Sequence, residues 1–231
     1  MPGEELTLRL VEVLGHLPHA SNATLLSRDA DGTLWVYKPE AGEQPLWDFP
    51  WKTLAAREVL TFEVSEAMEL GIIPDTVMAT GQFGAGSAQR FLSEDDTFDP
   101  RPMFTEVLDP VLWPFAVLDI ITNNADRKIG HLLKEVGSGR LWGIDNGLTF
   151  HHHPKLRTVL WGFAGKPVPA ELLDKVALLD ESLGAGLCDR VASLLSPVEA
   201  GALVSRVRDL LDTGVHPDPP DDRPAVPWPV W

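Results

Sequence analysis

The chain has 231 residues, of which 44% are hydrophobic, and a formal net charge of −15. This composition supports a large core and excludes a disordered chain, while the acidic balance argues against nucleic acid and anionic lipid as partners. Cys188 is the only cysteine, and the N-terminus lacks the basic region of a signal peptide. No apolar stretch reaches the roughly 20 residues that span a bilayer. We therefore expect a soluble, cytoplasmic protein without an integral membrane segment.

The first 92 residues predict a small sheet with one helix. Strands are expected at residues 24–29, 33–39, 74–78 and 87–92. The first two are joined by an Asp31-Gly32 step, which is typical of hairpins. Residues 51–70 carry apolar side chains at helical spacing, and Gly71 stands where a helix often ends on glycine.

The second half is predicted to be helical, after an acidic connector at residues 93–105. Helices are expected within residues 108–123, 171–183 and 187–195, with a short strand-like segment at 140–150. A last helix opens with SPVE, in which Ser196 and Glu199 form a capping box. The organisation is therefore an N-terminal part (1–92), a connector, a helical part (106–215) and a proline-rich tail (216–231). We expect the tail to be extended and to lie on the surface through its two tryptophans.

The chain has three residues in the order that phosphoryl transfer needs: Lys38, Asp126 and Asp145. That reaction requires a cation on the phosphates, a carboxylate for a divalent metal and a carboxylate near the acceptor hydroxyl. Lys38 ends a predicted strand, and Glu58 on the following helix is its expected partner, with Glu63 as the alternative. The competing interpretation is an ordinary surface lysine and a solvated glutamate.

Asp126 and Asp145 are each delivered by an apolar segment into a polar turn. Asp126 lies in NNADRK after the expected buried helix, and Asp145 lies in LWGIDNG after a short strand. Turns favour Asp, Asn and Gly in any case, so each motif alone is a weak signal. Their order after Lys38 nevertheless favours one catalytic carboxylate and one metal ligand.

The segments YKP, REVLTFEVS, ELGIIP, NNADRKIGHLL and LWGIDNG together resemble bacterial, chiefly actinobacterial, proteins similar to phosphatidylinositol 3- and 4-kinases, and more distantly HipA-type kinases. The resemblance covers residues 10 to 180 and implies an α+β, protein-kinase-like, two-lobed fold with a small β-rich N-lobe and a helical C-lobe. It implies that Lys38 contacts the ATP phosphates and pairs with Glu58. By the same likeness, Asp126 is the catalytic aspartate and Asp145 binds the metal.

The loop after Asp126 departs from that family's pattern at two positions. The family tends to have Asp-Arg-His and an asparagine five residues after the aspartate, whereas this chain has Lys128 and His131 there. Lys128 either neutralises the transferred phosphate or is solvated. His131 is either a metal ligand or a structural residue, and an imidazole nitrogen suits Mn²⁺ better than Mg²⁺.

The phosphate cradle is expected before Lys38, at Ser21 and Asn22 in HASNATLL, although a plain hairpin turn fits this segment too. The glycine-rich GQFGAG (81–86) follows Lys38 and is interpreted as a turn between strands. The run His151–His153 could face a substrate, but neighbouring residues of a strand alternate faces, which argues against a metal site there.

We therefore expect an ATP-dependent phosphotransferase that uses Mg²⁺ or Mn²⁺ and transfers phosphate to a hydroxyl of a small molecule or a protein. Because of His131 and the weak phosphate cradle, two alternatives stay open: a nucleotide-binding pseudokinase with a regulatory role, and a transferase of AMP. The oligomeric state and the identity of the acceptor are left open by the sequence.

Overall fold

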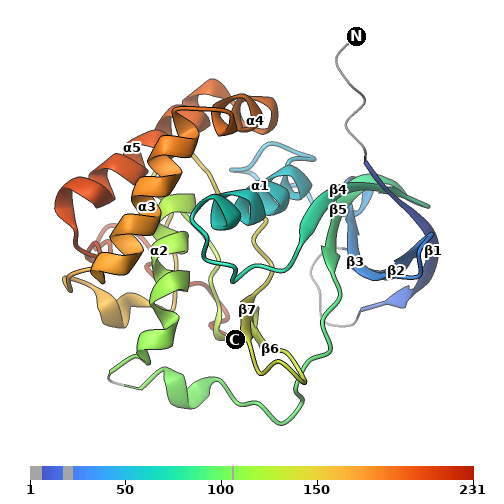
Figure 1. The fold of residues 1–231 in the computed structure, drawn as a ribbon, viewed down its shortest axis with the longest axis horizontal. Coiled ribbons are helices and arrows are strands. Elements are labelled where there is room, and N and C mark those ends of the chain that lie inside the picture. Colours follow the sequence, from blue (N-terminus) through green and yellow to red (C-terminus); the bar gives the residue numbers. More distant parts are fainter. Residues whose placement is uncertain (1–6, 18–22, 106) are drawn as a thin grey trace.

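The computed structural model describes residues 7–17, 23–105 and 107–231 (Figure 1). The strands are β1 (Leu8–His16), β2 (Leu25–Asp29), β3 (Leu34–Pro39), β4 (Thr76–Gly81), β5 (Gly84–Arg90), β6 (Leu132–Lys134) and β7 (Leu141–Gly143). The α-helices are α1 (Leu54–Ala67), α2 (Trp113–Thr122), α3 (Ala170–Leu183), α4 (Leu187–Leu194) and α5 (Pro197–Thr213). The predicted α+β class is confirmed, with most strands before residue 92 and most helices after it.

Strands β1 to β5 close into a barrel in the order β1-β2-β3-β5-β4, seen on the right of Figure 1. Neighbours are antiparallel except β1 and β4, which run parallel and close the barrel. A small apolar cluster in the barrel consists of Leu10, Leu25, Tyr37, Ala79 and Ala88. Strand β1 is missing from the sequence-based prediction, because two register shifts against β2 interrupt its alternation of buried and exposed residues.

The two predicted hairpin turns are present. At the first, the Asp29 carboxylate accepts hydrogen bonds from the backbone N–H groups of Asp31 (3.0 Å) and Thr33 (2.9 Å), and Gly32 has a φ of +87° that favours glycine. At the second, GQFGAG forms the turn between β4 and β5 and the adjoining ends of both strands. Sequence therefore determines both connections locally.

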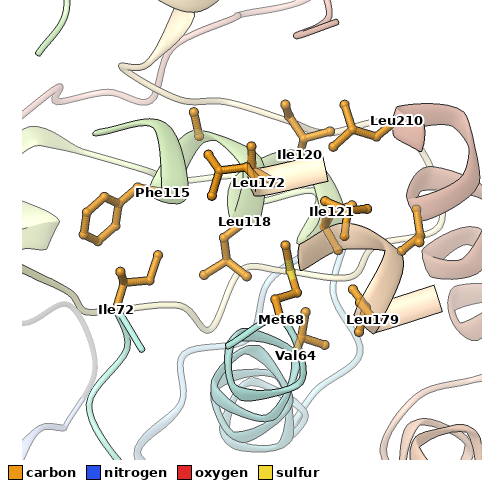
Figure 2. Packing of buried hydrophobic residues seen from close by; sticks show 14 of the residues in the cluster. Val64, Met68, Ile72, Phe115, Leu118, Ile120, Ile121, Leu172, Leu179 and Leu210 are labelled. Carbon is orange, nitrogen blue, oxygen red and sulfur yellow. The ribbon is translucent and has the colours of Figure 1, made fainter. Parts of the chain in front are cut away.

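Helix α1 lies between the barrel and the other helices and is buried on several sides. It ends earlier than predicted: Met68 is its C-cap, Glu69 takes a left-handed conformation (φ 51°), and Gly71, which is also left-handed (φ 57°), lies beyond the helix. Figure 2 shows Val64 and Met68 of α1 among side chains from α2, α3 and α5. Helix α1 therefore connects the barrel to the larger core.

The larger core is formed mainly by α1, α2, α3 and α5. Helix α5 begins with the predicted capping box: the Ser196 hydroxyl accepts from the Glu199 N–H, and the Glu199 carboxylate accepts from the Ser196 N–H. Across the described ranges, no helix combines the length and apolar character needed to cross a bilayer.

Candidate active site

Lys38 lies near the end of β3, opposite Ser87 of β5. The two strands approach closely here, since a Cβ added to Gly86 would come within 2.3 Å of the Lys38 carbonyl oxygen. The Lys38 ammonium contacts the Glu58 carboxylate from α1 and lies 2.9 Å from Asp145 Oδ1. The second oxygen of Glu58 accepts a hydrogen bond from the Ser87 hydroxyl at 2.8 Å. The barrel and α1 thus hold the ammonium in place.

Opposite charges decide the protonation of this cluster. Burial alone would lower the pKa of Lys38, but attraction to Asp145 and Glu58 outweighs it and raises that pKa. The Lys38 ammonium in turn holds the pKa of Asp145 well below its usual range. Lys38 and Asp145 are therefore both charged at neutral pH.

Asp126 lies in the loop that follows α2. Helix α2 ends at Asn123, which takes a left-handed conformation (φ 54°) and so turns the chain sharply. The Asn124 side chain donates to Asp119 Oδ1 (3.0 Å), and its oxygen accepts from the Asp126 N–H (2.9 Å). Asp126 Oδ2 lies 2.9 Å from the Lys128 ammonium. Burial raises the pKa of Asp126, and Lys128 partly offsets that rise.

A buried arginine joins this loop to the Asp145 loop. Arg127 and Asp119 are both fully buried, and Arg127 donates to both carboxylate oxygens of Asp119 at 3.0–3.1 Å. The same guanidinium donates to the Ile144 carbonyl (3.2 Å) and to the Asn146 side-chain oxygen (2.7 Å). Because Ile144 and Asn146 flank Asp145, this network fixes Asp126 and Asp145 relative to one another.

His131 contacts Asp145 from the end of the same loop. Its Nε2 lies 3.5 Å from Asp145 Oδ2, and its backbone carbonyl accepts from the Ile144 N–H at 2.9 Å. Its Nδ1 is buried and has no hydrogen-bond partner among the described residues. Burial is the main reason why the pKa of His131 falls from 6.5 to about 4. The ring is therefore neutral at physiological pH.

This neutral histidine predicts a pH dependence of stability. Between about pH 4 and 6.5 the folded chain binds fewer protons at His131 than the unfolded chain, so its contribution to the free energy of unfolding falls as pH is lowered through this window. We expect His131→Asn to reduce the slope of unfolding free energy against pH by up to about 1.4 kcal/mol per unit. Urea unfolding of both proteins at several pH values, without added metal, measures this difference, and equal slopes would contradict it.

The structure brings most of the predicted site residues together. Lys38, Glu58, Asp145 and His131 form one connected cluster, and Asp126 with Lys128 lies on the loop that Arg127 ties to it. The alternative partner Glu63 instead pairs with Arg190 at 2.9 Å. The predicted cradle residues Ser21 and Asn22 lie outside the described residues.

The sequence gives weaker signals for four residues that complete the site: Ser87, Asp119, Arg127 and Asn146. An aspartate within the apolar run AVLDII is the best of these signals, because a charge in a buried helix needs a partner. Its partner could not be named, since the spacing of residues does not reveal which cation folds back onto it.

The histidine run lies apart from this cluster. His151, His152 and His153 have adjacent rings with centroids 4.0–5.6 Å apart, and no group of three or more metal-binding side chains occurs within the described ranges. A cavity of about 360 Å³ lies between residues 47–50, His151, His152 and the start of α5, but Lys38, Asp126 and Asp145 do not line it. The electrostatic cluster therefore defines the candidate active site better than the cavity does.

Comparison with known proteins bears on the fold and the family of the chain. No family model matches the chain. Among solved structures, the proinflammatory kinase CtkA of Helicobacter pylori is similar, with a TM-score of 0.56 over 90% of this chain and 93% of CtkA. Only 10% of residues are identical, so this similarity shows a kinase-like fold and nothing about the acceptor.

A curated relative is closer in sequence. Protein Rv2133c of Mycobacterium tuberculosis is 38% identical over an alignment of 256 positions, gaps included, which covers 95% of this chain and 91% of that protein. Its source agrees with the actinobacterial resemblance read from the sequence. The chain has a kinase-like fold and belongs to the family of protein Rv2133c.

Proposed function

We propose that this chain is an ATP- and divalent-metal-dependent phosphotransferase of the phosphatidylinositol 3-/4-kinase-like superfamily. The observation that carries the proposal is the cluster in which Lys38 contacts both Glu58 and Asp145, next to a loop that holds Asp126. The kinase-like fold supports a phosphotransferase. The proposal includes a two-lobed arrangement, with the barrel and the helical part as lobes and the nucleotide between them.

Each charged residue has a distinct role in this proposal. Lys38 binds phosphate oxygens of ATP, and Glu58 holds the ammonium in place through its contact with Ser87. Asp126 accepts the proton of the acceptor hydroxyl or orients that hydroxyl for attack. Lys128, 2.9 Å from Asp126, neutralises charge on the transferred phosphoryl group.

Asp145 and His131 fit a divalent ion that arrives with the nucleotide. Mg²⁺ in such sites is held by one or two carboxylates together with phosphate oxygens and water. The Asp145 carboxylate is 55% exposed, and Nδ1 of His131 has no other partner among the described residues, so the ring can turn toward an ion. When bound, the ion would neutralise charge on the β- and γ-phosphates. The mixed oxygen and nitrogen donor pair favours Mn²⁺ over Mg²⁺.

The acceptor class follows from charge. A net charge of −15 repels anionic bilayer surfaces, so a hydroxyl of a soluble metabolite, a polyol or a protein is favoured over a lipid.

ATP labelled at the γ- or the α-phosphate, incubated with Mg²⁺ or Mn²⁺, separates the possible activities. Transfer of the γ-label supports the proposal, and transfer of the α-label supports an AMP transferase. Binding without transfer supports a pseudokinase, and the absence of any ATP-dependent rise in melting temperature contradicts nucleotide binding altogether.

Asp145→Asn is expected to weaken Mn²⁺-dependent ATP binding by about 10- to 100-fold, because it removes the charged ligand of the ion. Its effect on the free energy of unfolding should stay below about 1 kcal/mol, since the carboxylate is half exposed. Titration calorimetry with and without Mn²⁺ measures the affinity. Asp75→Asn is the matched control, because Asp75 also forms an exposed ion pair, with Arg90 at 3.4 Å. Equal affinity in wild type and Asp145→Asn would remove Asp145 from the metal site.

A further inference from the structure

The proline-rich tail follows α5 and has no further helix or strand among the described residues. Of its two tryptophans, Trp228 is 90% exposed and Trp231, which contacts Arg101, is 56% exposed, so the tail is attached less by these side chains than the sequence suggests. Hydrogen bonds to its backbone attach it at three places. In Figure 1 the C-terminus is drawn next to β6 and β7, and a hydrogen bond from Ile129 to Val230 places the end of the tail at the loop that contains Asp126.

The tail is attached first beside α5. The N–H of His216 donates to the Lys166 carbonyl, and the His216 carbonyl accepts from the Gly165 N–H, both at 3.0 Å. The His216 ring is buried among Trp113, Trp161 and other aromatic side chains. This first attachment belongs to the larger core and does not depend on the residues that follow it.

The second attachment is at Ala225, whose carbonyl accepts from the Thr158 N–H (3.1 Å) and from Trp161 Nε1 (2.7 Å). Thr158 in turn donates its hydroxyl to Asp119 Oδ2 at 3.1 Å. The neighbouring residues 157 and 159 exchange backbone hydrogen bonds with Arg127. At Ala225 the tail therefore supports the segment that pairs with the Asp126 loop.

The third attachment is on the loop itself. The N–H of Ile129 donates to the Val230 carbonyl at 2.9 Å, and Gly130 lies against the backbone of Trp231. The Arg101 guanidinium lies 5.9 Å from the Trp231 ring centroid. Ile129 begins the 3-10 turn that ends at His131, and Lys128 precedes it. The tail thus holds the turn that lies between two of the proposed site residues.

We propose that residues 225–231 are a positioning segment for the loop from Asp126 to His131. The Val230 carbonyl is the only described hydrogen-bond partner of the Ile129 N–H. Without that carbonyl, the Ile129 N–H bonds to water, and the first residue of the 3-10 turn is no longer tied to the tail. Lys128 then samples more than one position, whereas the Ile144 N–H still holds the His131 carbonyl. The consequence for catalysis rests on the proposed phosphotransferase function, whereas the consequence for loop order does not.

Three variants of the 231-residue chain test the proposal. One variant ends at Pro224, a second lacks only Val230 and Trp231, and Trp228→Ala in the 231-residue chain is the matched control because this side chain is exposed. All three should fold, since the His216 attachment is retained. Amide hydrogen exchange is the readout that does not require activity.

The expected exchange pattern is graded. Removing Val230 and Trp231 should speed exchange at Ile129 by about tenfold or more and leave Thr158 and Arg127 protected. Ending the chain at Pro224 should also expose the Thr158 amide, and a peptide of residues 217–231 added in trans should restore protection. Unchanged exchange at Ile129 in both truncated chains would overturn the proposal whether or not the protein transfers phosphate.

The catalytic consequence is measured separately. Both truncated chains should show a kcat for phosphoryl transfer that is about 10- to 100-fold lower, with an unchanged Kd for ATP, because Lys128 is displaced and the cluster of Lys38, Glu58, Asp145 and His131 is not. Faster exchange with unchanged kcat would overturn the catalytic part of the proposal. If the wild-type chain transfers no phosphate, the proposed function fails while the exchange result still decides whether the tail orders the loop.

Discussion

Asp126→Asn is expected to lower the kcat of phosphoryl transfer by about 100- to 10,000-fold while leaving the Kd for ATP nearly unchanged. Asparagine has the same shape as aspartate but cannot accept a proton, and the backbone N–H at this position keeps its bond to the Asn124 side chain. The substitution therefore changes the chemistry at one atom and retains the loop. Steady-state kinetics with varied ATP measures both parameters.

The control for this variant is Asp212→Asn, on the exposed side of α5 and far from the loop in sequence. It should leave both kcat and Kd unchanged. If Asp126→Asn kept more than a tenth of the wild-type kcat, Asp126 would not be the catalytic carboxylate. If it instead abolished ATP binding, its role would lie in holding the nucleotide.

Arg127→Ala is expected to have the largest effect on stability, about 3–5 kcal/mol of unfolding free energy, because it leaves the Asp119 carboxylate buried without its cation. Burial already raises the pKa of Asp119, so the unpaired carboxyl should become protonated more readily in the variant. Arg127→Lys should be only partly tolerated, since an ammonium cannot reach Asp119, Ile144 and Asn146 at once.

Urea unfolding measures this loss, with Arg208→Ala as the control. Arg208 pairs with Asp180 at 3.6 Å on the surface, and its removal should cost less than about 1 kcal/mol. Adding Asp119→Leu to Arg127→Met should recover part of the stability, although the Asn124 and Thr158 side chains then lose an acceptor. A decrease of less than about 1 kcal/mol in the unfolding free energy of Arg127→Ala would contradict a stabilising role for the Arg127 hydrogen-bond network.

Locally encoded features of the fold could be predicted well. The capping box at Ser196 and the Asp31-Gly32 turn depend on residues within four positions of one another, so their sequence signals are complete. The end of α1 could not be predicted, because Glu69 takes a left-handed conformation although it is not glycine. Strand β1 could not be predicted either, because it pairs in parallel with β4, which is distant in the sequence.

In the site, too, some features could be predicted from the sequence and others could not. The order of Lys38, Asp126 and Asp145 predicts a cluster, and the structure places Lys38 against Asp145 across 107 residues. The connection that fixes the two loops runs through Arg127, Asp119 and Asn146, and no spacing rule relates these three. The hydrogen bond from Ile129 to Val230 is equally invisible in the sequence, since the tail composition predicts only an extended chain.

The most direct test of the proposed site is a crystal structure of the 231-residue chain with ATP and Mn²⁺, in which anomalous scattering locates the ion. We predict an Mn²⁺ peak within coordination distance of the Asp145 carboxylate, with the His131 ring turned toward it and the Lys38 ammonium on a phosphate oxygen. A nucleotide bound away from Lys38, or an Mn²⁺ peak without Asp145 among its ligands, would contradict it.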